Sequence, residues 1–491
     1  MAVRRRRSRG TAIHRALHSQ LTDRSFYLSG LIVFALFPLL VACQSMLPQT
    51  RPPLAEEGAA LLYIEPFTQE ADRLRFEIEG ISARKADGGE FPFSLKLTEL
   101  RGREITRQRL LGEAEMPPGA YEGFTVKVKK AFLRGEGGET ALLVPEDPVM
   151  IAFPFRVEKK KAFVLTFAFR GGQAVRSGMT FRPDFLVGIP PRPVSGLTGY
   201  VTDEGSNMVT IFDKKTGEVA GVIATEGGPA GMALDQSGLK AYVAVPTADA
   251  IEVVDVVASE ITDRIRLNLG DGPEALALTP DGRTLLSTNT GSNTVSFIDT
   301  TSLAERGRVT VGNGPRWVII DSLGRRAYVL NRMSSSVSVL DIANRGLVTT
   351  IGTDPSPLQC RLDKLGATLY VVHEWSPWVS VIDTTKLSVK RMPVTMGLRS
   401  IKIDTNTALL YMGRMGDRSV GAYDPNAIVP VDYISAEGDV TDMTIDGDMN
   451  NLIMISRDSM RLTIVNLISR KTLSVIDVGE APCLVEVMGE R

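Results

Sequence analysis

The segment SNTVSFID, residues 292–299, carries the pattern that decides the fold of this chain. Polar and apolar side chains alternate in its middle and an aspartate ends it, which is typical of a short β-strand that runs into a turn. Six other segments align with it: VTIFD ending at 213, IEVVD at 255, VSVLD at 341, VSVID at 383, VGAYD at 424 and LTIVN at 466. The intervals are 42, 44, 42, 42, 41 and 42 residues. A regular period in the low forties indicates a repeat architecture.

Two further sets of residues follow the same period. One set lies inside a β-patterned run and consists of Tyr200, Tyr242, Leu286, Tyr328, Tyr370, Tyr411 and Ile453. The other opens a short apolar run and consists of Pro229, Pro273, Pro315, Pro357, Leu398, Val440 and Pro482. Since such units match four-stranded blades, we predict a β-propeller over residues 199–491. The chain enters its first blade at the second strand and supplies the missing first strand from residues 482–488. The pattern therefore predicts seven blades, closed by the two ends of the domain.

These repeats resemble the YVTN family of surface-layer and periplasmic propellers. The resemblance spans about residues 199–491 and rests on Tyr328-Val329-Leu330-Asn331, Leu286-Ser287-Thr288-Asn289, Gly314-Pro315 and the segment 292–299. It implies a seven-bladed propeller that binds or scaffolds, because members of the family share no active site. Later blades depart from the pattern: Leu398 and Val440 replace the proline, and Arg414 and Ser456 replace the repeated asparagine.

Residues 1–42 have the features of an export signal. Seven arginines precede an uncharged apolar run from Phe26 to Ala42, as in a signal peptide. The run ends in Leu40-Val41-Ala42-Cys43, which resembles the lipobox of bacterial lipoproteins and implies lipidation of Cys43. Gln44 follows, rather than the aspartate that in that family retains proteins in the inner membrane, so we expect an outer-membrane anchor. It would face the periplasm or the cell surface. The alternative is a retained N-terminal anchor helix.

Two linkers divide the rest of the chain. Residues 43–58 are polar and contain prolines, as expected of a tether between a lipid and a domain, and residues 189–198 form a second proline-rich linker. Between them, residues 59–188 contain short alternating segments separated by glycine and proline turns, including 61–64, 74–78, 93–97, 124–128 and 163–167. Short strands at this spacing predict a small antiparallel β-sandwich. The whole chain is therefore expected to be all-β.

Composition restricts the chemistry of the chain. The 491 residues include 3 histidines and 3 cysteines, and His373 is the one histidine that follows the signal. No haem-attachment motif, multi-histidine zinc pattern or G-x-S-x-G elbow occurs. We therefore predict no catalytic residue, no cofactor and no metal. From Cys43 onward the chain has 49 basic and 56 acidic residues, a net charge of −7, which argues against nucleic-acid binding.

Periodic aspartates are predicted to cap turns rather than to bind metal, because one hydrogen-bonding role explains a residue that recurs in every repeat. One set ends the repeated strand and consists of Asp213, Asp255, Asp299, Asp341, Asp383 and Asp424. The other lies in hairpins and consists of Asp235, Asp281, Asp321, Asp363, Asp404 and Asp446.

One face of the predicted propeller gathers rarer residues. Loops that enter first strands and loops between second and third strands share a face, and the three tryptophans fall in these loops. Tryptophan beside arginine is favoured at binding hot spots. The candidate binding residues are Trp317, Trp375, Trp378, His373, Glu374, Arg316, Arg332, Arg399 and Arg414. The alternative is that Trp317 begins a buried strand while Trp375 and Trp378 seal adjoining blades.

We therefore expect a membrane-anchored envelope lipoprotein that acts as a non-enzymatic binding or scaffolding platform for an envelope protein or a polysaccharide. The alternative is a propeller hydrolase of the lactonase type, which would need converging carboxylates with calcium or a second histidine around the central channel. Binding of single-stranded DNA is a third hypothesis, which the net negative charge disfavours.

Overall fold

The computed structural model describes residues 51–426 and 429–490. The predicted signal peptide and Cys43 lie outside this range. Strands dominate, so the predicted all-β class is confirmed. The helical segments are short: η1 (Gln69–Ala71), α2 (Gly171–Ala174), η2 (Ser195–Leu197), η3 (Glu204–Ser206) and η4 (Pro246–Ala248). Within the described ranges, no helix has the length and apolar character needed to cross a membrane.

The N-terminal part begins with a five-stranded sheet in the order β13-β10-β1-β6-β4. Its strands are β1 (Gly58–Ile64), β4 (Ser94–Leu95), β6 (Arg109–Met116), β10 (Ala162–Phe169) and β13 (Phe185–Gly188). β1 and β10 pair in parallel, with Tyr63 opposite Thr166, so the prediction of a purely antiparallel arrangement was wrong for this pair. Alternation along a strand predicts which residues face the core, but not the direction of a partner strand about a hundred residues away.

The second sheet of this part has six strands. They are β2 (Leu74–Lys85), β3 (Glu90–Pro92), β5 (Glu99–Arg101), β7 (Gly119–Gly135), β8 (Gly138–Leu142) and β9 (Val149–Val157). A separate two-stranded hairpin consists of β11 (Val175–Arg176) and β12 (Thr180–Phe181). Both larger sheets contribute to one hydrophobic core, for example Leu62 from the first sheet and Phe76 and Phe124 from the second. Tyr121 is buried in this core, and its hydroxyl donates to the carbonyl of Pro117 at 2.8 Å.

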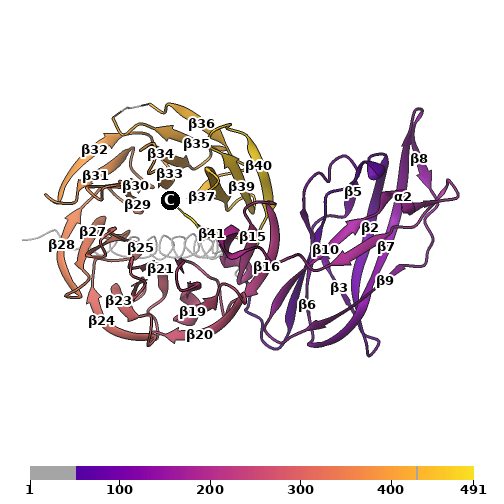
Figure 1. Cartoon of the computed structure of the whole chain (residues 1–491), viewed down its shortest axis with the longest axis horizontal. Helices are drawn as coiled ribbons and strands as arrows, with labels where there is room; N and C mark the ends of the chain where they lie inside the picture. The colour runs from indigo at the N-terminus through magenta and orange to yellow at the C-terminus, as the bar shows by residue number, and fades with distance from the viewer. Residues whose placement is uncertain (1–50, 427–428, 491) are drawn as a thin grey trace, which may run out of the picture. The chain divides into compact units, whose positions relative to one another are not determined.

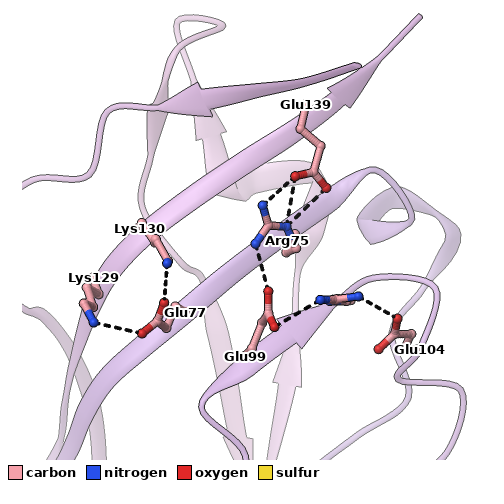
Figure 2. A network of polar contacts seen from close by, with 8 residues as sticks. Arg75, Glu77, Glu99, Glu104, Lys129, Lys130 and Glu139 are labelled. Carbon is pink, nitrogen blue, oxygen red and sulfur yellow. Dashed lines mark hydrogen bonds and ion pairs between the residues drawn. The ribbon is translucent and has the colours of Figure 1, made fainter. Parts of the chain in front are cut away.

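Charged side chains on the six-stranded sheet form a network (Figure 2). Arg75 on β2 lies between Glu139 on β8 and Glu99 on β5, with N–O distances of 2.5 and 2.8 Å. Glu77, two residues along β2, pairs with Lys129 and Lys130 of β7. Exposed cross-strand pairs of this kind contribute little stability each. They keep this face of the sheet polar.

Seven four-stranded antiparallel sheets are found in the described residues from 198 onward (Figure 1). Sheet 1 joins β14 (Thr198–Asp203), β15 (Met208–Asp213) and β16 (Glu218–Ala224) to β41 (Pro482–Val487). Sheet 2 contains β17–β20 (Met232–Asp235, Lys240–Val245, Ala250–Asp255, Glu260–Arg266), and sheet 3 contains β21–β24 (Pro273–Leu278, Thr284–Asn289, Thr294–Asp299, Ala304–Thr310).

The remaining sheets follow the chain in the same way. Sheet 4 contains β25–β28 (Pro315–Ile320, Arg326–Asn331, Ser336–Asp341, Gly346–Gly352), and sheet 5 contains β29–β32 (Pro357–Leu362, Thr368–His373, Trp378–Asp383, Ser388–Pro393). Sheet 6 contains β33–β36 (Leu398–Ile403, Leu410–Arg414, Ser419–Tyr423, Asp432–Ser435), and sheet 7 contains β37–β40 (Val440–Asp446, Asn451–Ser456, Arg461–Asn466, Thr472–Asp477).

The sheets follow one another around a ring, with their first strands innermost (Figure 1). Each first strand contacts the first strand of the next sheet, and β41 contacts β17. The predicted pairing between the two ends of the domain is confirmed, because β41 runs antiparallel to β14 with Val485 opposite Val201. The periodic tyrosines Tyr200, Tyr242, Tyr328 and Tyr411 are all fully buried. The predicted β-propeller is therefore confirmed as the fold of this region.

Turn capping by the periodic aspartates is also confirmed at the strand ends. The Oδ1 atom of Asp213 accepts hydrogen bonds from the backbone N–H groups of Lys215 and Thr216 at 2.7 and 3.1 Å. In a hairpin, Asp235 accepts from the N–H of Gly238 at 2.7 Å. Each carboxylate thus satisfies backbone donors that the tight turn leaves unpaired.

Candidate functional site

Most of the candidate residues lie at one end of the innermost strands, which we call the rim. Antiparallel pairing places the start of each first strand opposite the end of the second strand, as Pro357 lies opposite His373. The residue that follows the start of a first strand and the residue that follows the end of a second strand therefore lie at the same end of the sheet. This is why side chains spaced about 42 residues apart meet there.

Two arginines of the rim converge on one buried carboxylate. Glu374 is 7% exposed and forms an ion pair with Arg332. Arg399 of the next sheet approaches the other carboxylate oxygen, with its Nη2 atom 3.4 Å from Oε1. Arg332 also donates from Nε to the hydroxyl of Ser356 at 3.1 Å. Because two cations share one anion, the cluster has a net positive charge and a fixed geometry.

Trp375 and Trp378 are the exposed aromatic residues of the rim. Trp375 lies in the turn between β30 and β31 and is 60% exposed, whereas Trp378 begins β31 and is 37% exposed. The turn is held at one point by the hydroxyl of Ser376, which accepts from the backbone N–H of Trp378 at 3.2 Å. Both indoles therefore offer apolar area next to the Glu374 cluster in sequence and in the fold.

The rim contains further ion pairs that the sequence analysis missed. Arg316 lies 3.1 Å from a carboxylate oxygen of Glu274, and burial raises the pKa of this carboxyl. Arg457 pairs with Glu204 at 2.7 Å and donates to the sulfur of Cys483 at 3.1 Å. Burial raises the pKa of the Cys483 thiol to about 12, so the sulfur stays protonated at neutral pH.

Repeat spacing could have found these missed residues. Glu274 follows the opening proline of its first strand, as Arg316 does. Glu204 and Arg457 follow the last residue of a second strand, the same position that Arg332 and Glu374 occupy. The rim positions therefore follow from aligning all seven repeats, whereas the candidate binding residues are centred on the tryptophans.

Two of the candidate residues lie inside the propeller. His373 is 0% exposed and its Nε2 atom lies 2.9 Å from the Ser380 hydroxyl. Burial lowers the pKa of this histidine to about 4, so it is neutral at pH 7. Trp317 is half-buried on β25, with the Arg361 guanidinium 4.9 Å from the centre of its ring. It is the third residue of β25 and packs against buried residues of two neighbouring clusters.

Charged groups on the innermost strands pair with one another. Asp442 accepts from Nε2 of Gln359 at 3.1 Å and lies 3.7 Å from Arg361. Burial raises the pKa of Asp442. Lys402 forms an ion pair with Glu490, whose pKa it lowers although burial opposes ionisation. Asp442, Arg361 and Lys402 are therefore engaged in contacts within the ring.

No group of three or more His, Cys, Asp or Glu side chains that could hold a metal ion was found among the residues that the structure places.

Residues 204–402 match the family described as the YNCE-like beta-propeller. No curated protein matches the sequence. The matched region covers sheets 2–5 completely and sheets 1 and 6 in part, so it identifies a propeller over less than half of the chain.

Solved structures with the same fold share little sequence with this chain. Hydrazine synthase of Kuenenia stuttgartiensis is 20% identical, with a TM-score of 0.52 over 56% of this chain and 94% of that chain. A functionally unknown protein of Desulfotomaculum acetoxidans is 11% identical, with a TM-score of 0.51 over 58% and 99% of the two chains. At these identities the likeness supports the propeller fold alone.

Proposed function

We propose that this chain is a lipid-anchored envelope protein whose propeller is a non-enzymatic platform that binds an envelope protein or a glycan at the rim. In this proposal Cys43 carries the lipid, the two-sheet part from residue 59 to 188 is an accessory β-sandwich, and residues 199–491 form a closed, seven-bladed propeller of the YVTN type. The outer membrane is its proposed location.

The observation that carries the proposal is the pair of exposed indoles beside a preorganised, positively charged cluster. Trp375 and Trp378 are exposed although each is large and apolar, and such residues dominate binding energy where they occur in interfaces. Glu374 fixes the side chains of Arg332 and Arg399, so these two arginines lose little conformational entropy when a partner binds.

The arrangement of the innermost strands favours binding over hydrolysis. The hydrolase alternative places its reaction around the central axis, where a substrate would have to meet free carboxylates. There Asp442 is held by Gln359 and Arg361, and Lys402 is held by Glu490. These contacts give the charged groups a structural role. This supports a platform rather than an enzyme.

The test of the proposal is the double variant Trp375→Ala/Trp378→Ala. We expect it to reduce recovery of envelope partners at least tenfold in pull-down from crosslinked cells, because a hot-spot aromatic contributes about 2 kcal/mol or more. The matched control is Leu323→Ala/Leu365→Ala, which removes two exposed apolar side chains (67% and 85% exposed) from loops between first and second strands, at the other end of the sheets. Equal recovery from wild type and the tryptophan variant would refute a role for the rim. Identifying what crosslinks to position 375 would show whether the partner is a protein or a glycan.

A further inference from the structure

Sheet 6 breaks a polar pairing that several other sheets share. In sheet 4 the last residue of the second strand, Asn331, donates from Nδ2 to the hydroxyl of Ser338 in the middle of the third strand at 2.9 Å. His373 and Ser380 make the corresponding contact in sheet 5. Asn289 and Ser296 make it in sheet 3, at 2.8 Å. In sheet 6 the same positions hold Arg414 and Gly421.

A second contact is also replaced in sheet 6. In sheet 5, Arg391 on the fourth strand lies opposite Ser380 and donates two hydrogen bonds to Asp354, at 3.1 and 2.7 Å. Asp354 stands three residues before its first strand begins. The residues at the corresponding positions of sheet 6 are Tyr433, which lies opposite Gly421, and Thr395. In sheet 5 this ion pair and Ser380 line a cavity of about 450 Å³. In sheet 6 two uncharged side chains take the positions of the ion pair.

A cavity of about 300 Å³ lies at the corresponding place in sheet 6, with a different lining. Its lining includes Arg414, Asp417, Ser419, Gly421, Tyr423 and Tyr433. Gly421 is essential to its shape, because a Cβ atom there would lie 2.7 Å from Cε2 of Tyr423. A serine like that of sheets 3, 4 and 5 would displace this ring. The volume is at the lower end of small-molecule sites and suits one ring-sized ligand.

The polar groups of the cavity are charged but balanced. Arg414 donates from Nη2 to Oδ1 of Asp417 at 2.9 Å, and its Nε lies 2.7 Å from Oδ2. Its Nη1 donates to the hydroxyl of Thr395 at 3.2 Å. The pair offers hydrogen-bond donors and acceptors side by side without net charge. An anion would be repelled by Asp417 and a cation by Arg414, so the balance favours a neutral ligand rich in hydroxyl groups.

Two phenol rings complete the site. Tyr423 is mostly buried beside Gly421, whereas Tyr433 is 62% exposed on the short outer strand β36. Aromatic faces pack against the C–H surface of a sugar ring, while adjacent donors and acceptors bind its hydroxyls. We propose that this cavity binds one neutral sugar residue.

The cavity adjoins the turn that carries Trp378, because the N–H of Val394 in its lining donates to the carbonyl of Pro377 at 2.9 Å. Neither Trp375 nor Trp378 is part of the lining, so the two tryptophans can be varied without removing a wall of the cavity.

The experiment is saturation-transfer NMR on the detergent-solubilised full-length protein, with D-glucose, D-galactose, D-mannose and N-acetyl-D-glucosamine each at millimolar concentration. We expect transfer to at least one sugar. The variant Gly421→Ser, which places a side chain against Tyr423, and the double variant Thr395→Asp/Tyr433→Arg, which removes one phenol ring and adds two charges, should each weaken that binding at least tenfold. Tyr433→Phe, which keeps the ring, should retain it.

Each result of this experiment supports or overturns the proposed sugar site. Loss of the signal in both variants, with a melting midpoint near that of wild type, supports the site. Absence of transfer to all four sugars overturns it, as does binding that is unchanged in those variants. If Gly421→Ser fails to fold, the double variant alone decides. Trp375→Ala/Trp378→Ala should leave sugar binding intact, so a failure of the rim proposal is distinguished from a failure of this one.

Discussion

Lys214 shows how a single buried charge connects the two ends of the propeller. It follows β15 in sheet 1, and its Nζ atom lies 3.1 Å from Oδ1 of Asp446 at the end of β37. It also donates to the backbone carbonyl of Met488, just after β41. The lysine and aspartate side chains are 1% and 0% exposed. A buried pair of this kind depends on both partners, because either charge alone would be left without compensation.

We expect Lys214→Met to lower the free energy of unfolding by about 3–5 kcal/mol, because Asp446 would remain buried without its cation. Urea denaturation measures the change. The matched control is Lys215→Met, since this neighbouring lysine is exposed, and it should change stability by less than about 0.5 kcal/mol. Similar effects of the two substitutions would show that the buried pair does not stabilise the fold.

At the scale of the strand, the polar contact between the second and third strands of a sheet explains the position of His373, the one histidine of the described residues. His373 occupies the place of Asn289 and Asn331, and like them it bonds a serine of the neighbouring strand. Its Nδ1 atom has no hydrogen-bond partner within the part of the chain that the structure covers. Protonation would place a cation in the interior, and the cost of its burial outweighs the attraction of Asp354, so the pKa is lowered to about 4.

This histidine should make the protein less stable in mild acid. Its folded-state pKa lies below the unfolded value of about 6.5, so the unfolded chain gains a proton first as pH falls. The contribution of the neutral ring is thus fully present above pH 6.5 and is lost as pH falls toward 4. Between pH 7 and pH 4.5, we expect wild type to lose about 2–3 kcal/mol more than the His373→Asn variant. Asp203, whose pKa burial raises to about 7, is present in both proteins and cancels. Parallel urea curves at the two pH values test this, and equal losses would contradict it.

At the scale of the whole molecule, the ring depends on one strand that comes from the far end of the chain. β41 covers the edge of β14, and Val485 and Val487 join Val201 in one buried cluster. Without this strand, β14 would expose an unpaired edge, which favours aggregation. The closure also ties sheet 7 to sheet 1, since β37 contacts β41.

Truncation after Glu480 should lower the melting midpoint by roughly 10 °C, because burial of each valine contributes about 1.5–3 kcal/mol. A synthetic peptide of residues 481–490 should restore part of the loss by adding the missing strand in trans. Thermal melts with and without peptide, together with size-exclusion chromatography, measure both effects. An unchanged midpoint and a monodisperse truncated protein would contradict the role of this closure.

The sequence by itself determined what is local or periodic in this protein. Alternation and a spacing of about 42 residues predicted the strands, the propeller and the pairing of β41 with β14, and the aspartates at positions such as Asp213 were predicted to cap turns. These features depend on neighbours a few residues away or on one repeated unit. The tertiary structure alone decided the parallel pairing of β1 and β10, the partners of Arg316 and Arg399 at the rim, the burial of His373 and the cavity beside Gly421. Each of these depends on side chains that are far apart in the chain, and on the volume that a missing side chain leaves, which no local pattern specifies.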